Sequence, residues 1–379
     1  MRQRFAFKVI ASGDPVLLQN GHREEKVAGE RVAVIGGAGN LGSQIVLQLL
    51  QAGYAPVVVA RRPEKAARVL SGIQVETRRG DVTDLESLRV ALKGCTYAHS
   101  TVALVNQVFM GATRAEEDEV VRTNLEGTLN VLRAAHEQGI KRVILTGSCS
   151  LRYTRAGTMA HEDSPPTDLE LVSDPYVRSK LQAELAASEF AQETGLQVVH
   201  ILPGALIGPP AWEPALLNEE VLKRLNGDRM PMVDGRVMVV DVRDVARAHA
   251  KATEVEPVRP AYLMVADTIS MRKLYGLITQ LGGMPPLAFM SPKIAMAFAL
   301  LAEVAAGLFG RAPLFNRNAV RHVSRDRRFD CSRAQRELGV TFTPIATTVC
   351  ELVQWFLDNG FASNPEALRS RVTGRPTAE

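Results

Sequence analysis

The stretch Arg31-Val-Ala-Val-Ile-Gly-Gly-Ala-Gly-Asn-Leu-Gly42 decides the fold of this chain. Its first half is a short apolar run, which is typical of a strand buried on both faces of a parallel sheet. Gly36, Gly39 and Gly42 follow at three-residue intervals, and Leu41 opens an apolar pattern with helical spacing. A strand, a glycine turn and a helix in this order predict a dinucleotide site, because glycine lets backbone amides at the helix N-terminus approach a pyrophosphate.

Strand-like and helix-like segments alternate through the next part of the chain. Strands are expected at 56–60, 73–77, 95–99, 142–146 and 197–202, with helices beginning near Glu64 and Asp84 and running through 116–138 and 176–193. This alternation predicts an α/β fold, in which right-handed βαβ units build a doubly wound parallel sheet of the Rossmann type.

The alternation breaks after Pro203, where prolines and glycines become frequent. Late strands are expected at 236–240 and 261–265, and the pattern from Ser270 onward is mainly helical. We therefore expect an N-terminal extension at 1–29 with no assigned role and an NAD(P)-binding domain at 30–203, to which 236–265 returns. A smaller, mainly helical substrate lobe would comprise 204–235 and 266–362, followed by a polar tail at 363–379.

Composition excludes several function classes. The net charge of +4, from 45 basic and 41 acidic residues, is too mild to indicate nucleic-acid binding. The cysteines Cys95, Cys149, Cys331 and Cys350 lie far apart, with no CxxC and no histidine at metal-ligand spacing. We therefore expect neither a disulfide framework nor a metal site, and with no export signal evident we expect a reduced, cytoplasmic protein.

The segment 294–309 is rich in Ala, Leu and Phe but is interrupted by Glu303. It is shorter than the roughly 20 apolar residues that a membrane span needs. We expect a buried or interfacial amphipathic helix here, with a peripheral membrane contact as the alternative.

The stretch Tyr176-Val-Arg-Ser-Lys180 carries the candidate chemistry. A spacing of four places both side chains on one face of a helix. An ammonium beside a phenol favours the phenolate, lowering a pKa that is about 10 in isolation, so that Tyr176 exchanges a proton with a carbinol oxygen near neutral pH. Lys180 is also placed to hold the nicotinamide ribose hydroxyls. The alternative is an exposed helical Tyr and Lys without chemistry.

Ser148 follows the strand at 142–146 and offers a hydroxyl that could bind the substrate oxygen. Thr146 and Ser150 are rivals for that role. Each of the three could instead be a turn or cap residue.

The cofactor type is indicated by Ala60-Arg61-Arg62, at the end of the second strand. An NAD site usually has a carboxylate there, whereas a 2′-phosphate calls for arginine, so NADP is favoured over NAD. A solvated strand end is the alternative. Asp81 and Val82 are placed at the adenine edge, unless Asp81 is an ordinary helix-entry residue. The complete cofactor-binding set that we predict is Gly36, Gly39, Asn40, Leu41, Gly42, Arg61, Arg62, Asp81, Val82, Tyr176, Lys180 and Pro203.

These motifs together resemble the extended short-chain dehydrogenase/reductase superfamily, which includes the NAD-dependent epimerases and dehydratases. The resemblance rests on Gly36-x-x-Gly39-x-x-Gly42, Asn124-Leu-Glu-Gly-Thr128, Thr146-Gly-Ser148, Tyr176-Val-Arg-Ser-Lys180-x-x-Ala-Glu184, Asp241-Val-Arg-Asp-Val-Ala246 and Phe329-Asp-Cys-Ser-Arg-Ala-Gln-Arg-Glu-Leu-Gly339. Within it, Ile201-Leu-Pro-Gly-Ala-Leu-Ile-Gly-Pro209 and the helix 294–310 are most similar to the dihydroflavonol reductase and 3β-hydroxysteroid dehydrogenase branch.

The resemblance implies a nicotinamide cofactor and Ser148, Tyr176 and Lys180 as catalytic residues. By the same analogy, a homodimer would form through 114–138 and 176–193. Asn124 would tie the active-site loops together, or be a structural helix residue. Asp241 and Asp244 have a simple alternative as N-caps of the following helix.

One departure concerns the end of the fourth strand, where His99-Ser-Thr-Val102 replaces the family's small Ala-Ala pair. This change is expected to alter the wall beside the nicotinamide.

The function we predict is an NADP(H)-dependent oxidoreductase that interconverts a ketone and a secondary alcohol, with Tyr176 as general acid or base. The lobe has few clustered acids and bases and many apolar residues, Trp212 and Met230 among them, which favours a bulky apolar small molecule as substrate. Two alternatives remain: an NAD-retaining nucleotide-sugar epimerase or dehydratase, and a non-catalytic dinucleotide-sensing module.

Overall fold

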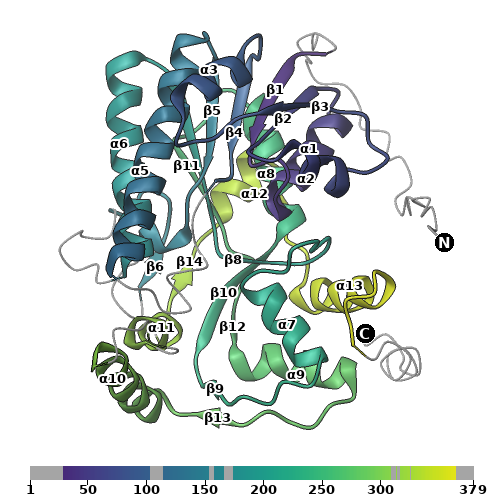
Figure 1. Ribbon diagram of the computed structural model, residues 1–379, viewed down its shortest axis with the longest axis vertical. Coiled ribbons are helices and arrows are strands. Elements are labelled where there is room, and N and C mark those ends of the chain that lie inside the picture. The colour runs from purple at the N-terminus through teal and green to yellow at the C-terminus, as the bar shows by residue number, and fades with distance from the viewer. Residues whose placement is uncertain are drawn as a thin grey trace.

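A computed structural model of the chain describes residues 29–102, 114–152, 158–165, 174–308, 313, 316–324 and 326–363. A large parallel sheet with helices on both faces occupies the upper part of Figure 1, and a smaller lobe lies below it. The expected extension at 1–28 and the tail from 364 onward lie outside the described residues.

The large sheet has seven strands, and every neighbouring pair is parallel. Their spatial order is β11 (Ala261–Met264), β7 (Gln197–Pro203), β5 (Arg142–Thr146), β4 (Tyr97–Ser100), β1 (Arg31–Ile35), β2 (Ala55–Ala60) and β3 (Glu76–Arg79). The direction in which strands are added reverses between β1 and β4, which is the switch point where doubly wound sheets bind their ligands. The predicted Rossmann-type fold is confirmed.

Strand β1 shows why helices cover both faces of this sheet. Val32 and Val34 pack with α1 (Asn40–Gln51) and α8 (Val242–Glu254), whereas Ala33 and Ile35 pack on the other side. Successive strand side chains point to opposite faces, so an uninterrupted apolar strand needs a helix layer on each. The first layer also contains α2 (Pro63–Val69) and α12 (Ser332–Glu337), and the second contains α3 (Leu85–Leu92), α5 (Arg114–Glu137) and α6 (Pro175–Thr194).

The third strand starts later than the pattern indicates. Strand pairing with β2 begins at Glu76, although 73–77 was the expected range. Ile73 and Val75 are half-buried and pack against the core from an irregular segment. Their apolar spacing therefore reflects burial without a strand ladder.

The smaller lobe is built on a three-stranded sheet of β12 (Asp267–Ser270), β10 (Arg236–Asp241) and β8 (Ala205–Ile207). Helices α7 (Leu217–Leu225), α9 (Met271–Gly282) and α13 (Ile345–Asp358) share its apolar core. The Trp212 and Trp355 rings meet edge to face, with centroids 4.9 Å apart. A small sheet thus stands at the centre of a lobe expected to be mainly helical.

Strand β10 lies at the seam between the two parts. Of the segment 236–265, β11 is a strand of the large sheet and α8 packs on one of its faces, whereas β10 pairs with β8 and β12. Val237 and Val239 face the core of the lobe, and Val240 faces the core beneath the large sheet. One strand therefore contributes to both cores.

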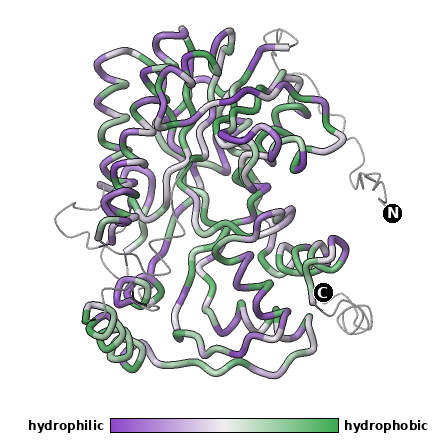
Figure 2. The backbone as a smooth tube through the Cα atoms, in the orientation of Figure 1, coloured by the Kyte–Doolittle hydropathy of each residue, from purple (hydrophilic) through white to green (hydrophobic). Residues whose placement is uncertain are grey.

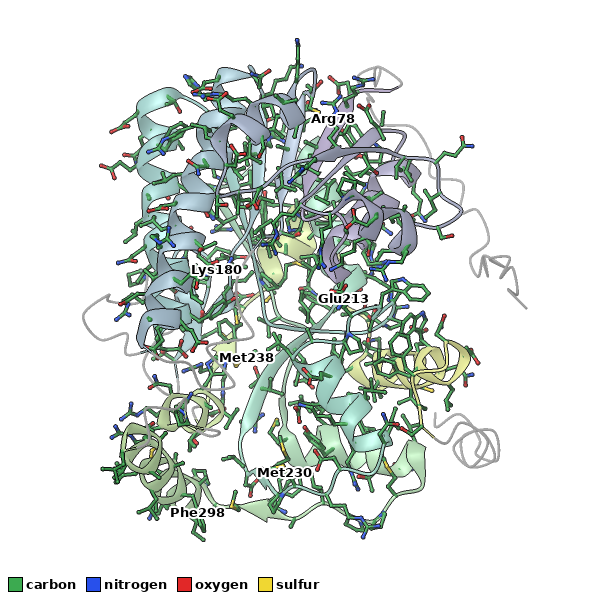
Figure 3. All side chains as sticks on the ribbon, in the orientation of Figure 1. Arg78, Lys180, Glu213, Met230, Met238 and Phe298 are labelled. Carbon is green, nitrogen blue, oxygen red and sulfur yellow. The ribbon has the colours of Figure 1, made fainter. Side chains whose placement is uncertain are left out.

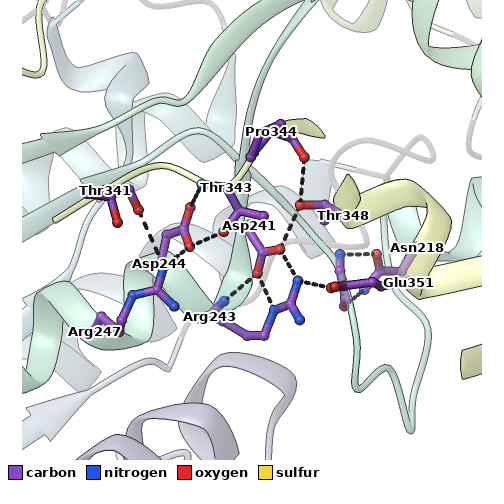
Figure 4. Close-up of polar contacts among 11 residues, drawn as sticks. Asn218, Asp241, Arg243, Asp244, Arg247, Thr341, Thr343, Pro344, Thr348 and Glu351 are labelled. Atoms are coloured by element: carbon purple, nitrogen blue, oxygen red, sulfur yellow. Dashed lines mark hydrogen bonds and ion pairs between the residues drawn. The ribbon is translucent and has the colours of Figure 1, made fainter. Parts of the chain in front are cut away.

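A polar cluster fixes the seam (Figure 4). Buried Asp241 is the N-cap of α8, and its carboxylate accepts from the Arg243 amide at 2.8 Å and from Thr348 Oγ1 of α13 at 2.7 Å. Asp244, one turn into α8, accepts from the backbone of Thr343 at 2.6 Å. The N-cap alternative therefore holds for Asp241, while Asp244 anchors the segment that leads into α13.

Short elements complete the described chain. They are η1 (Cys149–Arg152), β6 (Met159–Ala160), β9 (Met232–Val233), β13 (Phe289–Met290), α10 (Pro292–Leu308), α11 (Arg317–Val323) and β14 (Arg328–Phe329). Helix α10, at the lower left of Figure 1, is predominantly hydrophobic in Figure 2. Among the helices of the described ranges, none has the length and apolar character required to cross a bilayer.

Candidate active site

The glycine turn after β1 forms a cradle that side chains would fill. Gly36 has a φ of +83°, and a Cβ there would lie 2.6 Å from Thr101 Oγ1. A Cβ on Gly42 would lie 2.2 Å from the Gly36 carbonyl oxygen. Gly39 is the N-cap of α1 and offers no side-chain acceptor to the first helical amides. The residues present therefore fit a dinucleotide pyrophosphate, which would accept hydrogen bonds from those amides.

Arg61 and Arg62 follow β2 at the same edge of the sheet. Both side chains are exposed, and neither forms an ion pair within the described part of the chain. Their guanidinium groups are therefore available to an anionic ligand.

A residue of the smaller lobe that the sequence did not single out reaches this edge. Asn40 Nδ2 donates to the Glu213 carbonyl oxygen at 3.1 Å, and Lys65 Nζ contacts the Glu213 carboxylate at 2.5 Å. The loop after β8 thus bridges the cradle and α2. Figure 3 shows Glu213 and Lys180 at the lower end of the large domain, facing the smaller lobe.

Asp81 has a local role in the described structure. Its Oδ1 accepts from Thr83 N at 3.0 Å and from Thr83 Oγ1 at 2.9 Å, which makes a compact turn before α3. Asp84 caps that helix. Val82 packs against Gly127, where a Cβ would approach it to 3.0 Å. Pro203 is buried at the end of β7 and pairs with Met264. Their predicted contacts with a cofactor stay predictions.

The structure brings Tyr176 and Ser148 together at the carboxyl end of β5. Asp174 caps α6 by accepting from the Tyr176 amide at 2.9 Å, which fixes Tyr176 in the first turn. A side-chain hydrogen bond joins Tyr176 to Ser148. The carboxyl ends of β1, β4 and β5 lie on one edge of the sheet, so this pair and the glycine cradle are found at the same edge.

The pKa of Tyr176 corrects one expectation. Burial raises it, and the hydrogen bond from Ser148 offsets that effect in part. The net shift of this pKa is upward, whereas the Lys180 ammonium was expected to lower it. Lys180 Nζ instead donates to the Thr146 carbonyl oxygen at 2.9 Å. Burial lowers the pKa of Lys180 to about 8.

The rivals of Ser148 point elsewhere. Thr146 Oγ1 lies 3.0 Å from His249 Nε2 of α8, on the face of the sheet away from α6. Ser150 is buried and donates to Ser148 Oγ at 2.8 Å. Asn124 of α5 donates to Ser179 Oγ of α6 at 3.0 Å, so it ties the tyrosine helix to its neighbour. The hydroxyl of Ser148 is the one that forms a hydrogen bond affecting the pKa of Tyr176.

The stretch His99-Ser-Thr-Val102, expected to alter the wall beside the nicotinamide, places His99 and its later residues in different surroundings, and its effect on the cofactor stays a prediction. The His99 side chain is fully buried under α8, with Nδ1 3.2 Å from His249 Nδ1. The residues that border the cradle are Thr101 and Val102, which a Cβ on Gly36 would meet at 2.6 and 3.3 Å. A histidine in a strand ending at the cofactor edge is a weak signal, because alternate side chains of that strand face opposite ways.

Arg327 is a second residue that the sequence interpretation missed. It is buried, and its charge lowers the pKa of Asp174, which burial raises. Its position near the start of α6 places a cation close to the Tyr176 end of the site.

A parallel sheet with a glycine cradle at its switch point, and a tyrosine, serine and lysine at the same edge, define a dinucleotide-dependent α/β enzyme. The chain belongs to the NAD dependent epimerase/dehydratase family, which it matches over residues 32–262. This confirms the predicted superfamily, and a nicotinamide dinucleotide is the cofactor of such enzymes.

The chain is also similar to individual proteins of known name. It is 28% identical to sterol demethylase protein B of Methylococcus capsulatus over 330 residues, which are 86% of this chain and 98% of that protein. It is 32% identical to tetraketide alpha-pyrone reductase 1 of Arabidopsis thaliana over 266 residues, which are 66% of this chain and 80% of the relative. The solved structure of MoeE5 in complex with UDP-glucuronic acid and NAD shares the fold, with a TM-score of 0.68 and 23% identity, covering 87% of this chain and 100% of that one.

Proposed function

We propose that this protein is an NADP(H)-dependent reductase that converts the ketone of a bulky, apolar small molecule to a secondary alcohol. The observation that carries the proposal is the hydrogen bond between Tyr176 and Ser148 at the cofactor edge of the sheet. Two hydroxyls that can both donate to one carbonyl oxygen can polarise it and then protonate it.

The glycine cradle, Arg61 and Arg62 would hold the cofactor. Gly36 and Gly42 leave room for the pyrophosphate, and the free guanidinium groups after β2 suit the 2′-phosphate of NADP. When bound, the reduced nicotinamide supplies the hydride that the ketone carbon receives. Lys180, one turn from Tyr176, would hold the ribose hydroxyls.

The protonation state of Tyr176 favours the reductive direction. Burial raises the pKa of Tyr176, so its hydroxyl keeps its proton at neutral pH. A neutral phenol is the form required of a general acid, and Tyr176 Oη would pass its proton to the developing alkoxide. Ser148, held by Ser150, would keep its hydrogen bond to the same oxygen through the reaction.

The surroundings of Tyr176 support an apolar substrate. Its ring packs against a buried cluster that includes Val177, Leu202, Met238 and Leu263. The relative named sterol demethylase protein B points to the same substrate class, because its name refers to a polycyclic apolar molecule.

A panel of steroidal, flavonoid-like and aliphatic ketones with NADPH and NADH, followed by nicotinamide absorbance, tests the proposal. Tyr176→Phe should lower turnover about 1000-fold, the scale of a lost general acid. Tyr97→Phe is the matched control, since Tyr97 begins β4 at the opposite edge of the sheet and its loss should leave turnover unchanged. Full turnover by Tyr176→Phe would refute the assignment of the acid.

A second candidate is an NAD-retaining epimerase or dehydratase acting on a nucleotide sugar. Buried Arg327 near Asp174 favours it, because a guanidinium can pair with a diphosphate. Purified protein that releases NAD and consumes no NADPH with any ketone would support this candidate over the reductase.

A further inference from the structure

A chain of buried polar side chains runs behind the active-site edge of the sheet. His99 Nε2 lies 3.0 Å from Thr253 Oγ1, and His99 Nδ1 lies 3.2 Å from His249 Nδ1. His249 Nε2 lies 3.0 Å from Thr146 Oγ1. Both histidines are fully buried, and burial lowers the pKa of His99 to about 3 and that of His249 well below its usual range. Both rings are therefore neutral at physiological pH.

Neutral rings restrict the direction of these hydrogen bonds, because each imidazole has one donor and one acceptor nitrogen. The Thr253 hydroxyl donates to the His249 carbonyl oxygen at 3.2 Å, which leaves His99 Nε2 to donate to Thr253. His99 Nδ1 is then an acceptor, so His249 carries its proton on Nδ1 and accepts at Nε2. The Thr146 hydroxyl must be the donor to that nitrogen.

The reverse direction leaves one proton without a partner. If Thr253 donated to His99, His249 would donate to Thr146, and the Thr146 hydroxyl proton would have no acceptor among the described residues. Buried polar groups are nearly always hydrogen-bonded, which selects the first arrangement.

Thr146 connects this chain to the catalytic face. Its side chain is held by His249 on one face of the sheet, while its carbonyl oxygen accepts from Lys180 Nζ at 2.9 Å. Lys180 comes from α6 on the other face. The position of the Lys180 acceptor therefore depends on the backbone of Thr146, which the contact between its side chain and His249 helps to hold.

We propose that His99 and His249 are a neutral histidine pair of fixed tautomer that positions Thr146, and through its carbonyl the Lys180 ammonium. They are positioning residues, since neither ring reaches the glycine cradle. The kinetic part of the proposal rests on the proposed reductase function, whereas the tautomer assignment does not.

Other charged groups lie near the histidine pair and near Lys180. Arg142 donates to the Thr253 carbonyl oxygen at 3.2 Å, at the end of α8. Lys180 is near His200 of β7. Burial lowers the pKa of His200, Arg152 and Lys180 lower it further, and Glu184 acts in the opposite direction. The pKa of each histidine of the pair is lowered by burial, and that of His249 is lowered by His99 as well.

Histidine-selective ¹⁵N labelling tests the tautomers without any ligand. Among the signals of the seven histidines, the one lost in His249→Gln should come from a ring protonated at Nδ1, and the one lost in His99→Gln from a ring protonated at Nε2. Neither resonance should titrate near 6.5, the pKa of an ordinary histidine. Titration of the His99 or His249 ring, or the opposite pair of tautomers, overturns the proposal.

A double-mutant cycle tests the positioning role. Thr146→Val should lower kcat/KM for the ketone about tenfold, by displacing the Lys180 acceptor, and weaken NADPH binding measured by fluorescence. Thr146→Ser, which restores the hydroxyl, should recover turnover to within about twofold.

His249→Gln should add nothing to Thr146→Val, because both substitutions act on the same contact with Lys180. Full additivity would overturn the proposal, whereas a wild-type protein that reduces no ketone would refute the reductase function and leave the tautomer result intact.

Helix α10 carries a second inference from a separate observation. Six of its large apolar side chains are between 46% and 79% exposed, namely Ile294, Phe298, Leu300, Leu301, Val304 and Leu308. Only the small residues Ala295 and Ala299 are buried, against Val233 and Val320. The helix therefore turns its large side chains outward, which is the reverse of an ordinary amphipathic surface helix.

The charges around this face are basic. Glu303, the acidic residue of α10, is paired with Arg317 of α11 at 2.6 Å. Lys293 at the start of α10 and Arg321 of α11 are exposed. Phe298 and Met230, the latter 71% exposed, lie at the same end of the long axis of the molecule in Figure 3.

The geometry points to the outer face of α10, from Ile294 to Leu308, as a docking surface for an anionic lipid bilayer. An exposed apolar stripe with basic residues beside it suits a helix that lies in the membrane interface. A surface of this kind would bring the smaller lobe to the place where bulky apolar molecules dissolve.

Co-sedimentation with phosphatidylcholine vesicles, with and without phosphatidylglycerol, tests the surface. The wild type should sediment mainly with the anionic vesicles, and Phe298→Glu/Leu301→Glu should reduce the bound fraction about fivefold or more. Val90→Glu/Leu185→Glu, at exposed apolar positions on α3 and α6, is the matched control and should bind like the wild type. Unchanged binding by the α10 variant overturns the proposal. So does a wild-type dimer that binds no vesicles and dissociates in that variant, since a second copy would then cover the face.

Discussion

The large sheet and the smaller lobe hold their functional residues in place by different means. The cofactor edge of the sheet is made of backbone: at Gly42 an added Cβ would come within 2.2 Å of another carbonyl oxygen. The lobe is attached to the sheet through the side chains of Asp241 and Asp244, which accept from Thr348 of α13 and from Thr343 in the segment that leads into α13. Backbone geometry tolerates no added methyl group, whereas side-chain packing tolerates volume-conserving changes. We therefore expect changes of side-chain volume to be tolerated better in the lobe than in the glycine cradle.

The seam should be the weakest point of this arrangement. Asp241→Ala leaves Arg243 with Glu351 as its carboxylate partner and removes both the α8 cap and the acceptor of Thr348. Loss of one partner from a buried ion pair costs about 3–5 kcal/mol, so the free energy of unfolding in urea should fall by about 3 kcal/mol or more.

Thr348→Val keeps the shape of the seam and removes one hydrogen bond to Asp241. Its cost should be about 1–2 kcal/mol. Equal stability of Asp241→Ala and the wild type would show that the lobe is held by its apolar core alone.

A methyl group in the cradle should act on binding more than on substrate choice. Gly42→Ala should weaken NADPH binding about 100-fold, because the turn must move away from the α1 N-terminus to admit the Cβ. Fluorescence titration of NADPH measures the effect.

Gly276→Ala is the matched control in the lobe. Nothing lies within 4 Å of a Cβ at this helical position, so the substitution should stabilise the protein by about 0.5–1 kcal/mol and leave NADPH binding unchanged. Similar cofactor affinities for the two variants would contradict the contrast between the halves.

Local patterns were enough for the cofactor half. A buried apolar strand, three glycines and a helix lie in one stretch, and strand order then brings Tyr176 and Ser148 to the same edge. The start of β3 was misplaced, because Ile73 and Val75 are apolar for packing and not for strand pairing. The site residues stay predictions with respect to the cofactor, although the structure brings Tyr176, Ser148 and Lys180 to one place.

Long-range pairings could not be read from the sequence. His99 and His249 are 150 residues apart, and neither has a neighbour in sequence that marks it as a partner. Glu213 reaches Lys65 across 148 residues for the same reason. The pKa of Tyr176 also depends on burial, which a helical spacing does not report. Contacts of this kind are set by the packing of the finished fold.

A pH titration tests whether the large half also depends on its buried histidine pair. The folded pKa of His99 is about 3, below the ordinary value, so the unfolded chain binds more protons between about pH 3 and 6.5. Stability should therefore fall as the pH drops below about 6.5, by up to about 2 kcal/mol for each histidine by pH 5.

Urea unfolding at these two pH values measures the loss. His99→Gln/His249→Gln removes both titrating groups, so it should lose less stability on acidification than the wild type. The same loss in both proteins would mean that other groups dominate the acid response.

The smallest effect is expected from the exposed arginines Arg61 and Arg62, which follow β2 at the cofactor edge of the sheet. Arg61→Ser/Arg62→Ser removes both guanidinium groups but no buried contact, because neither side chain is engaged by the described residues. An exposed charge–phosphate contact is worth about 1–2 kcal/mol, so the ratio of kcat/KM for NADPH over NADH should fall about tenfold while stability stays constant. Arg68→Ser, at another exposed arginine of α2, should leave the ratio unchanged. A wild type that already prefers NADH would remove the argument from Arg61 and leave Tyr176, Ser148 and Lys180 as assigned, since that assignment does not rest on Arg61 or Arg62.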